Sequence, residues 1–222
     1  AGYHPLASPM PPQIEAIVRR SPEEILGLSS ADPTHQSPEE IRAVCEHYHG
    51  RVGFRGLKPY TRNDVPYNDP RYDDYWTYAN AHRLYGLLHT ASNVGGMGAV
   101  RDLARRFPEV TFLVAHTGSS WRLARQVADA ASQFPNIVAE LTYTAAINGI
   151  IEWLCSRMGP ERVLFGTDAP MRDPRPQLGW CVYADLPEAH KRLLVGGNFA
   201  RILRRGDLPG HELPAVIRQA TA

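Results

Sequence analysis

This sequence has few cysteines, almost no net charge and no long apolar run. Cys45, Cys155 and Cys181 lie far apart and are odd in number, which argues against a disulfide framework or a CxxC zinc site and is typical of reduced thiols. A formal net charge of +1 gives no strong electrostatic attraction to nucleic acid or to a membrane surface. No apolar stretch approaches the roughly 18 residues of a spanning helix, and no signal peptide is evident. We therefore expect a cytoplasmic protein with no membrane or nucleic-acid partner.

The composition is that of one folded domain. The chain has 222 residues, of which 43% are hydrophobic, enough for a sizeable core. Its 19 prolines are spread along the chain and punctuate loops rather than mark a disordered tract. We expect residues 1–222 to form a single domain, with an N-terminal loop and helix in 1–24 and a peripheral tail in 206–222. The chain begins with Ala1 and not with methionine, which fits a processed protein or a piece of a longer one.

Short apolar runs alternate with longer amphipathic ones along the chain. The short runs predict strands at residues 25–30, 52–57, 87–89, 111–116, 137–141 and 163–166. The amphipathic runs predict helices near 37–49, 72–84, 97–107, 120–133, 144–158 and 187–195, and a short helix after 198, with a loop from 171 to 183. This alternation is typical of repeated βα units and predicts an α/β protein with a parallel sheet. A flavodoxin-like open sheet is an alternative, but no glycine-rich phosphate loop opens a helix here.

The helix that begins after residue 37 has clear start signals and carries two histidines near its end. Ser37 is an N-cap hydroxyl, Pro38 suits the first helical position and Glu40 completes a capping box. His47 and His49 lie in the last turn, where residues two apart point to different faces and cannot share a metal ion. We interpret both as favourable charges at a helix C-terminus.

Polar, chemically capable residues end four of the predicted strands. Lys58, His89, His116 and Asp168 each follow a short apolar run. In parallel α/β proteins the functional residues lie just past the carboxyl ends of the strands. A single histidine at the end of a strand is as often a structural, hydrogen-bonded residue as a functional one. His89, His116 and Asp168 together, at the same end of three strands, predict that they share one pocket. Two imidazoles and a carboxylate suit zinc or another first-row divalent ion.

Five short sequence motifs along the chain are similar to those of a known family. They are 53–58 (GFRGLK), 87–90 (LLHT), 115–118 (AHTG), 164–170 (LFGTDAP) and 196–200 (GGNFA). In order and spacing the sequence resembles the amidohydrolase-related family, in the branch that includes aminocarboxymuconate semialdehyde and resorcylate decarboxylases alongside lactone and amide hydrolases. The resemblance extends from about residue 25 to residue 205 and implies a (β/α)8 TIM barrel of the amidohydrolase type.

The resemblance also implies roles for individual residues. His89 corresponds to a metal ligand, and His116 to a residue that either contacts the metal or acts as a base. Asp168 corresponds to a metal ligand that can take a proton from water. Lys58 stands where some related barrels carry a carbamylated lysine between two metals, although a structural or substrate-contacting role is commoner in this branch. Asn198 corresponds to an asparagine that fastens the final helix to the barrel.

One feature of the family pattern is missing. The first strand of the family ends in His-x-His, which supplies two metal ligands, and only His47-Tyr48-His49 has that spacing here. The six predicted units also fall about two short of the eight in a barrel of roughly 250 residues. We therefore expect a barrel that is incomplete at its N-terminus. A fragment of a longer enzyme, a short form completed by another chain, and loss of the first strands with weakened metal binding are the three explanations.

The expected function is that of a metal-dependent hydrolase. A metal-activated water, with His116 or Asp168 accepting its proton, would act on a small carboxylate, amide or lactone substrate. The same residues suit a non-oxidative decarboxylase, and a catalytically inactive barrel that binds a partner is a further alternative. Zinc is the expected metal and manganese is possible.

Substrate contacts are expected from the loops that follow the strands. Arg172 can hold a substrate carboxylate through two hydrogen bonds, and Lys58 and Trp121 are further candidates. Other residues available in these loops are Arg55, Tyr60, Arg62 and Arg122. By resemblance to the family, a homodimer is expected.

Overall fold

The computed structural model describes residues 11–59, 64–90, 93–142 and 146–220. Its centre is a six-stranded sheet in which every neighbouring pair is parallel and the spatial order follows the chain, β1-β2-β3-β4-β5-β6. The strands are β1 (Leu28–Ser29), β2 (Gly56–Leu57), β3 (Tyr85–Leu88), β4 (Thr111–Val114), β5 (Ile137–Glu140) and β6 (Val163–Leu164). Each of the six apolar runs thus contains the strand predicted for it or overlaps it, and the parallel α/β prediction is confirmed.

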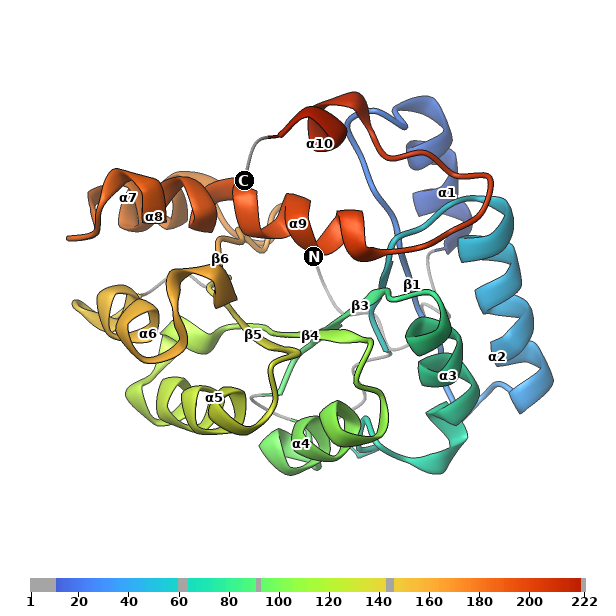
Figure 1. The fold of residues 1–222 in the computed structure, drawn as a ribbon. Helices are drawn as coiled ribbons and strands as arrows, with labels where there is room; N and C mark the ends of the chain where they lie inside the picture. Colours follow the sequence, from blue (N-terminus) through green and yellow to red (C-terminus); the bar gives the residue numbers. More distant parts are fainter. Residues whose placement is uncertain (1–10, 60–63, 91–92, 143–145, 221–222) are drawn as a thin grey trace.

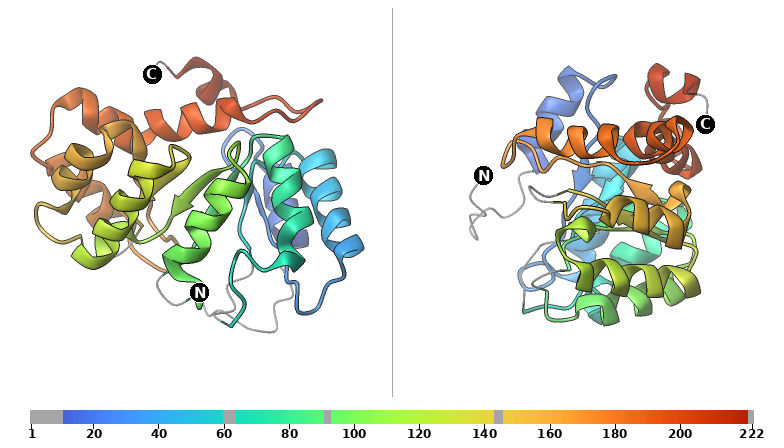
Figure 2. Two further views of the ribbon diagram at one scale, coloured as in Figure 1. Left: turned by 60° about the horizontal axis from the view of Figure 1, so that its bottom comes forward. Right: turned by 90° about the vertical axis from the view of Figure 1, so that its left-hand side faces the viewer.

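Helices surround the sheet, and those between successive strands cover its outer face (Figure 1). They are α1 (Pro11–Arg20), α2 (Pro38–Cys45), α3 (Asp73–Ala81), α4 (Gly96–Arg106), α5 (Trp121–Gln133), α6 (Ile150–Met158), α7 (Pro174–Tyr183), α8 (Glu188–Arg192), α9 (Asn198–Arg205) and α10 (Ala215–Gln219). Shorter π and 3-10 segments are η1 (Glu46–Arg51), η2 (Pro70–Tyr72), η3 (Thr117–Ser119), η4 (Pro160–Arg162) and η5 (Leu193–Gly197). Figure 2 shows α2 and α3 side by side along this outer layer.

The helix boundaries confirm some predictions and correct others. The capping box is present, because Ser37 accepts from the Glu40 backbone N–H while the Glu40 side chain accepts from the Ser37 backbone. The loop expected from 171 to 183 is wrong, since α7 occupies most of it. Asp173 accepts from the Arg175 backbone N–H and starts this helix with a proline in its first turn. α6 begins later than predicted, after Gly149 with φ of 78°.

The sheet separates two apolar clusters. On its outer face the strands pack against the surrounding helices in the main core, which includes the fully buried Trp76 and Phe112. On the inner face Tyr85, Leu113 and Leu164 pack with α9 and the tail. This division follows from the period of two in a strand, which sends alternate side chains to opposite faces. A cavity of about 410 Å³ remains on the inner face.

The final helices close over the inner face of the strands. Asn198, fully buried at the start of α9, donates from its side-chain amide to the carbonyls of Pro160 at 2.7 Å and Val163 at 2.9 Å. This confirms that the asparagine fastens the final helix to the strands. The Phe199 ring meets the Tyr85 ring edge-on, with centroids 5.3 Å apart. Ile217 of α10 packs on the same inner cluster, so part of the tail contributes to the core.

Within the part of the chain that the structure describes, no helix has the length and apolar character needed to span a bilayer.

Candidate active site

The carboxyl ends of the parallel strands meet at one edge of the sheet and bring the two predicted histidines together. His89 follows β3 and His116 lies just beyond β4, and these two strands pair in register along four residues. The two imidazole rings are 4.8 Å apart between centroids and nearly perpendicular, at 81°. The convergence predicted from the strand ends is therefore present for this pair.

The backbone and hydrogen bonds around His116 fix how its ring is presented. His116 adopts a left-handed conformation, with φ of 63°, which costs a non-glycine residue about 1–2 kcal/mol. Its Nδ1 bonds the carbonyl of Thr142, so the ring proton lies on Nδ1 and Nε2 keeps its lone pair. Burial lowers the pKa of His116, although the Thr142 hydrogen bond and the charge of Asp168 oppose this shift. The ring is therefore neutral at pH 7 and offers Nε2 as a base or ligand.

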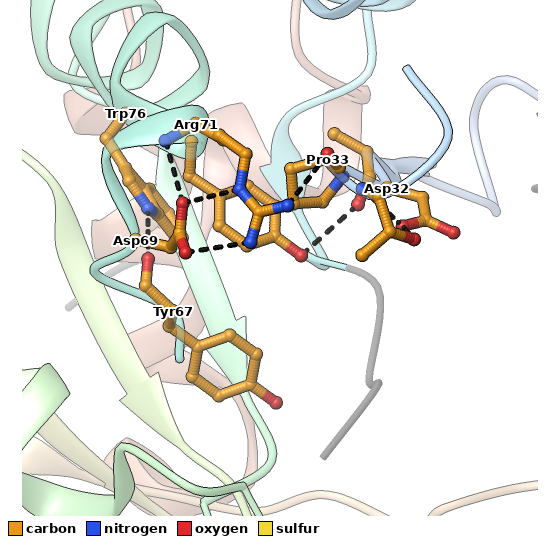
Figure 3. A network of polar contacts seen from close by, with 9 residues as sticks. Asp32, Pro33, Tyr67, Asp69, Arg71 and Trp76 are labelled. Carbon is orange, nitrogen blue, oxygen red and sulfur yellow. Dashed lines mark hydrogen bonds and ion pairs between the residues drawn. The ribbon is translucent and has the colours of Figure 1, made fainter. Parts of the chain in front are cut away.

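The loop before α3 is held by a network of polar contacts, of which Figure 3 shows those of Trp76 and Arg71. The Tyr67 hydroxyl donates to the His89 carbonyl at 2.9 Å, and the Trp76 indole donates to the Tyr67 carbonyl at 2.8 Å. Arg71 pairs with Asp69 at 2.8 Å and so stiffens the same loop. Burial and the neighbouring His116 and Lys58 lower the pKa of His89. This ring too is neutral at pH 7.

Asp168 and Arg172 lie on the loop after β6. Asp168 has a left-handed backbone, with φ of 57°, and its carbonyl accepts from the Arg172 N–H at 3.1 Å. The Asp168 carboxylate acts to raise the pKa of both His89 and His116, and the Arg172 charge acts to lower that of His116. Strained backbone at two of these residues is a common feature of functional sites. Both predicted residues thus lie within electrostatic range of the histidine pair.

Lys58 lies at the end of β2 among the same groups. Its backbone N–H donates to the Ser29 carbonyl at 2.8 Å, which ties the ends of β1 and β2 together. Burial lowers the pKa of Lys58, while the charges of Glu140 and Asp168 act against the shift. Lys58 in turn acts to lower the pKa of both histidines. A cation in this position suits an anionic substrate.

Glu140 is a site residue that the sequence analysis missed. It is the last residue of β5, 6% exposed, and its Oε1 accepts a hydrogen bond from the Thr142 hydroxyl while Oε2 is buried with no partner. Burial raises the pKa of Glu140 to about 7, against hydrogen bonds from Thr142 and the His116 backbone and the charge of Lys58. The signal in the sequence was a single carboxylate inside an otherwise apolar strand.

The side chains at this edge of the sheet supply part of the ligand set of a metal site. Within the described residues, no group of three His, Cys, Asp or Glu side chains is arranged to hold a metal ion. The neighbouring imidazoles of His89 and His116 supply two nitrogen donors of the kind that first-row divalent ions prefer. The donor chemistry therefore fits such an ion in part, with Asp168 nearby but no formed three-ligand cage.

Other residues predicted as substrate contacts make contacts within the fold or lie outside the described residues. The Trp121 ring packs edge-on against Trp153 of α6, with centroids 5.6 Å apart, so it belongs to a contact between helices. Arg55 precedes β2 and donates to the His211 carbonyl of the tail, so the prediction that it lies in a loop after a strand is wrong. Tyr60 and Arg62 lie outside the described residues.

The paired histidines near residue 48 are separated, as their spacing predicted. Nε2 of His47 pairs with a Glu15 carboxylate oxygen at 2.8 Å near the surface. His49 is fully buried, with Nε2 2.8 Å from the Ser29 hydroxyl and Nδ1 2.7 Å from the Phe54 carbonyl. Burial lowers the pKa of His49 to about 4. The interpretation as a helix-terminal charge is therefore wrong for His49, which is neutral and structural.

Comparison with known proteins gives the same fold. A family model described as amidohydrolase matches residues 13–205. An uncharacterised TIM-barrel protein from Bordetella bronchiseptica is 15% identical, with a TM-score of 0.74 over 87% of this chain and 72% of that one. 5-Carboxyvanillate decarboxylase from Sphingomonas paucimobilis is 19% identical, with a TM-score of 0.68 over 87% and 70% of the two chains.

A third similar structure contains a metal. Dihydroxybenzoic acid decarboxylase from Polaromonas sp. JS666, with bound manganese and the inhibitor 2-nitroresorcinol, is 17% identical, with a TM-score of 0.65 over 87% of this chain and 73% of that one. No curated protein sequence matches this chain. The structural similarities show a (β/α)-barrel fold of which this chain forms six strands.

Proposed function

Because this chain belongs to the amidohydrolase family, we propose that it is a metal-dependent hydrolase that acts on a small carboxylate, amide or lactone substrate. The observation that carries the proposal is the pair of neutral imidazoles, His89 and His116, on adjacent strand ends with rings 4.8 Å apart. Asp168, Lys58 and Arg172 lie within electrostatic range of this pair. Family membership favours an enzyme over the alternative of an inactive binding barrel.

The proposed metal ligands are His89 and His116, with Asp168 as the nearby carboxylate. Bound there, a divalent ion would supply Lewis-acid activation of a carbonyl and of water. Zinc suits two imidazoles and a carboxylate, and manganese is supported by the Polaromonas structure, which contains that ion.

The side chains of this chain have separable proposed roles. Nε2 of His116 is the ligand atom, because Nδ1 bonds the Thr142 carbonyl, so Asp168 accepts the proton at a carboxylate oxygen when water attacks. The same group then returns the proton to the leaving oxygen or nitrogen. Lys58 and Arg172 bind a carboxylate of the substrate through charge-assisted hydrogen bonds.

Decarboxylation is the second candidate. It is favoured by the similar structures of decarboxylases that act on aromatic carboxylic acids. In that reaction the bond to the carboxylate breaks, carbon dioxide leaves, and the electron pair takes a proton at the ring carbon. Glu140, whose pKa is raised to about 7 by burial, is a proton donor available for this step.

Turnover by the purified chain tests the proposal. Protein loaded with zinc or manganese is assayed for hydrolysis of lactones and N-acyl amides, and for release of carbon dioxide from hydroxybenzoates. Hydrolysis is the expected outcome, and His89→Ala and Asp168→Asn should each reduce it by at least about a hundredfold. His47→Ala, which alters a surface histidine paired with Glu15, is the control and should retain full activity.

The pattern of activities separates the candidates. Carbon dioxide release without hydrolysis would replace the hydrolase with the decarboxylase. Equal activity in the His89→Ala and His47→Ala proteins would remove the histidine pair from the reaction, and no turnover of any of these substrates with either metal would contradict both candidates.

A further inference from the structure

A cavity of about 510 Å³ lies between the N-termini of α4 and α5. Its wall includes Thr90, the residue that follows His89. It also includes Ser119, whose N–H donates to the His116 carbonyl at 2.9 Å. The cavity therefore adjoins both histidines through the loops that follow their strands.

The cavity is lined by donors and by positive charge. Of the described residues that line it, Arg122 is the only one with a charged side chain, so no carboxylate faces the space. The other polar lining residues are Thr90, Asn93, Ser119, Ser120 and Gln126. α4 and α5 are 11 and 13 residues long, and the N-terminus of each helix carries a partial positive charge. This lining suits an anion.

The Thr90 hydroxyl gives a second, independent indication of a ligand. Thr90 is 5% exposed, and its Oγ1 is buried with no hydrogen-bond partner. Buried hydroxyls in native proteins almost always have a partner, because an unpaired one loses its hydrogen bonds to water without compensation. An oxygen of a bound anion would accept a hydrogen bond from the Thr90 hydroxyl and so supply the missing partner.

We propose that this cavity binds an oxyanion group of the substrate, a carboxylate or a phosphate, at a distance from the bond that reacts. The Arg122 guanidinium and the Thr90 hydroxyl donate to it, and the helix N-termini favour its charge. The position of the reacting bond at His89 and His116 rests on the proposed function. The anion site itself does not, because binding can be measured without turnover.

Calorimetric titration of the metal-free chain with inorganic phosphate and with succinate, at neutral pH and constant ionic strength, tests the site. Saturable binding of at least one of the two is expected. Arg122→Gln should weaken it by about tenfold or more, since a charged hydrogen bond is lost. Arg125→Gln, the same change at an exposed position of the same helix outside the cavity wall, should leave the affinity unchanged.

A second variant separates binding from folding. Thr90→Val keeps the shape of the side chain and removes only the unpaired hydroxyl, so anion affinity should fall by about fivefold while the melting temperature does not fall. Tighter binding of phosphate than of succinate would identify a phosphorylated substrate, and the reverse a carboxylic one.

The proposal has clear contrary outcomes. Absence of saturable binding by the unaltered chain would overturn it, as would equal weakening by Arg122→Gln and Arg125→Gln. A lower melting temperature for Thr90→Val with unchanged affinity would show that the hydroxyl serves the fold. If the chain binds the anion but turns over no substrate, the anion site is supported and the proposed function is contradicted.

Discussion

At the scale of single residues, the site brings together side chains whose pKa values are shifted by burial. His89 and His116 are kept neutral by burial, while Glu140 holds its proton to about pH 7 for the same reason. Burial disfavours the charged form in each case, which lowers the pKa of an imidazole and raises that of a carboxyl group. The result is a pair of neutral imidazoles beside a carboxyl group that titrates at about pH 7, which suits proton-transfer chemistry.

The raised pKa of Glu140 predicts a specific dependence of stability on pH. Between its ordinary pKa of 4.5 and its folded value of about 7, the folded state holds a proton that the unfolded chain has released. The free energy of unfolding contributed by Glu140 therefore falls as the pH rises through this window, by up to about 1.4 kcal/mol per pH unit. Glu140→Gln should abolish this contribution.

The measurement is urea unfolding of both proteins at intervals from about pH 5 to about pH 8. The quantity compared is the difference between the two free energies of unfolding. His49, whose pKa is lowered to about 4, acts in the opposite direction but equally in both proteins, so it cancels. A difference that stays constant over this range would show that Glu140 is ionised in the folded protein at pH 5.

The site residues that follow strands could be predicted from the sequence, whereas Glu140, which lies within a strand, could not. Lys58, His89 and His116 each follow an apolar run, and the geometry of parallel strands is enough to predict that they converge. Glu140 lies inside such a run, where its role depends on Thr142 and the His116 backbone across the strand end. These are tertiary contacts that the spacing along the chain does not encode.

At the scale of elements, α9 is held to the strands by a polar clamp that Asn198 forms. Asn198 bridges the carbonyls of Pro160 and Val163, at the turn where η4 leads into β6. The buried amide thereby donates to two backbone carbonyls, of which that of Pro160 also accepts from the Val163 N–H. α9 can then lay Phe199 against Tyr85 on the inner face of the sheet.

Loss of this clamp should be costly. Asn198→Ala leaves two carbonyls without their amide donor, and we expect the free energy of unfolding to fall by about 2–3 kcal/mol. Chemical denaturation measures this, with Asn148→Ala at an exposed position as a control that should change stability by less than about 0.5 kcal/mol. Equal stability of the two variants would mean that the clamp contributes nothing.

Helices were harder to predict than strands, for local reasons. The helix from Ser37 was predicted because its capping box can be read from three residues. α7 was missed because Pro174, Pro176 and Gly179 suggest a loop, whereas both prolines lie in the first turn, where they cost little. The late start of α6 follows from Gly149, whose left-handed backbone could not be predicted from the apolar pattern.

At the scale of the whole molecule, the sheet is an arc with the outer helices on one side and the final helices on the other (Figure 1). In the described chain β1 and β6 each pair with a strand on one side only. The similar barrels extend further, since this chain covers 72% of the Bordetella protein and 70% of the Sphingomonas decarboxylase. The prediction of a barrel with six of its eight βα units is thus confirmed. The histidine pair lies at the carboxyl ends of β3 and β4.

Metal binding by the whole chain tests the central claim most directly. Metal-free protein is titrated with Mn²⁺ while the free ion is followed by electron paramagnetic resonance. We predict one saturable site in the unaltered chain and in His47→Ala, with affinity lowered at least about tenfold in His89→Ala and in His116→Ala. Absence of binding by the unaltered chain, or the same affinity in all four proteins, would contradict a metal centre at His89 and His116.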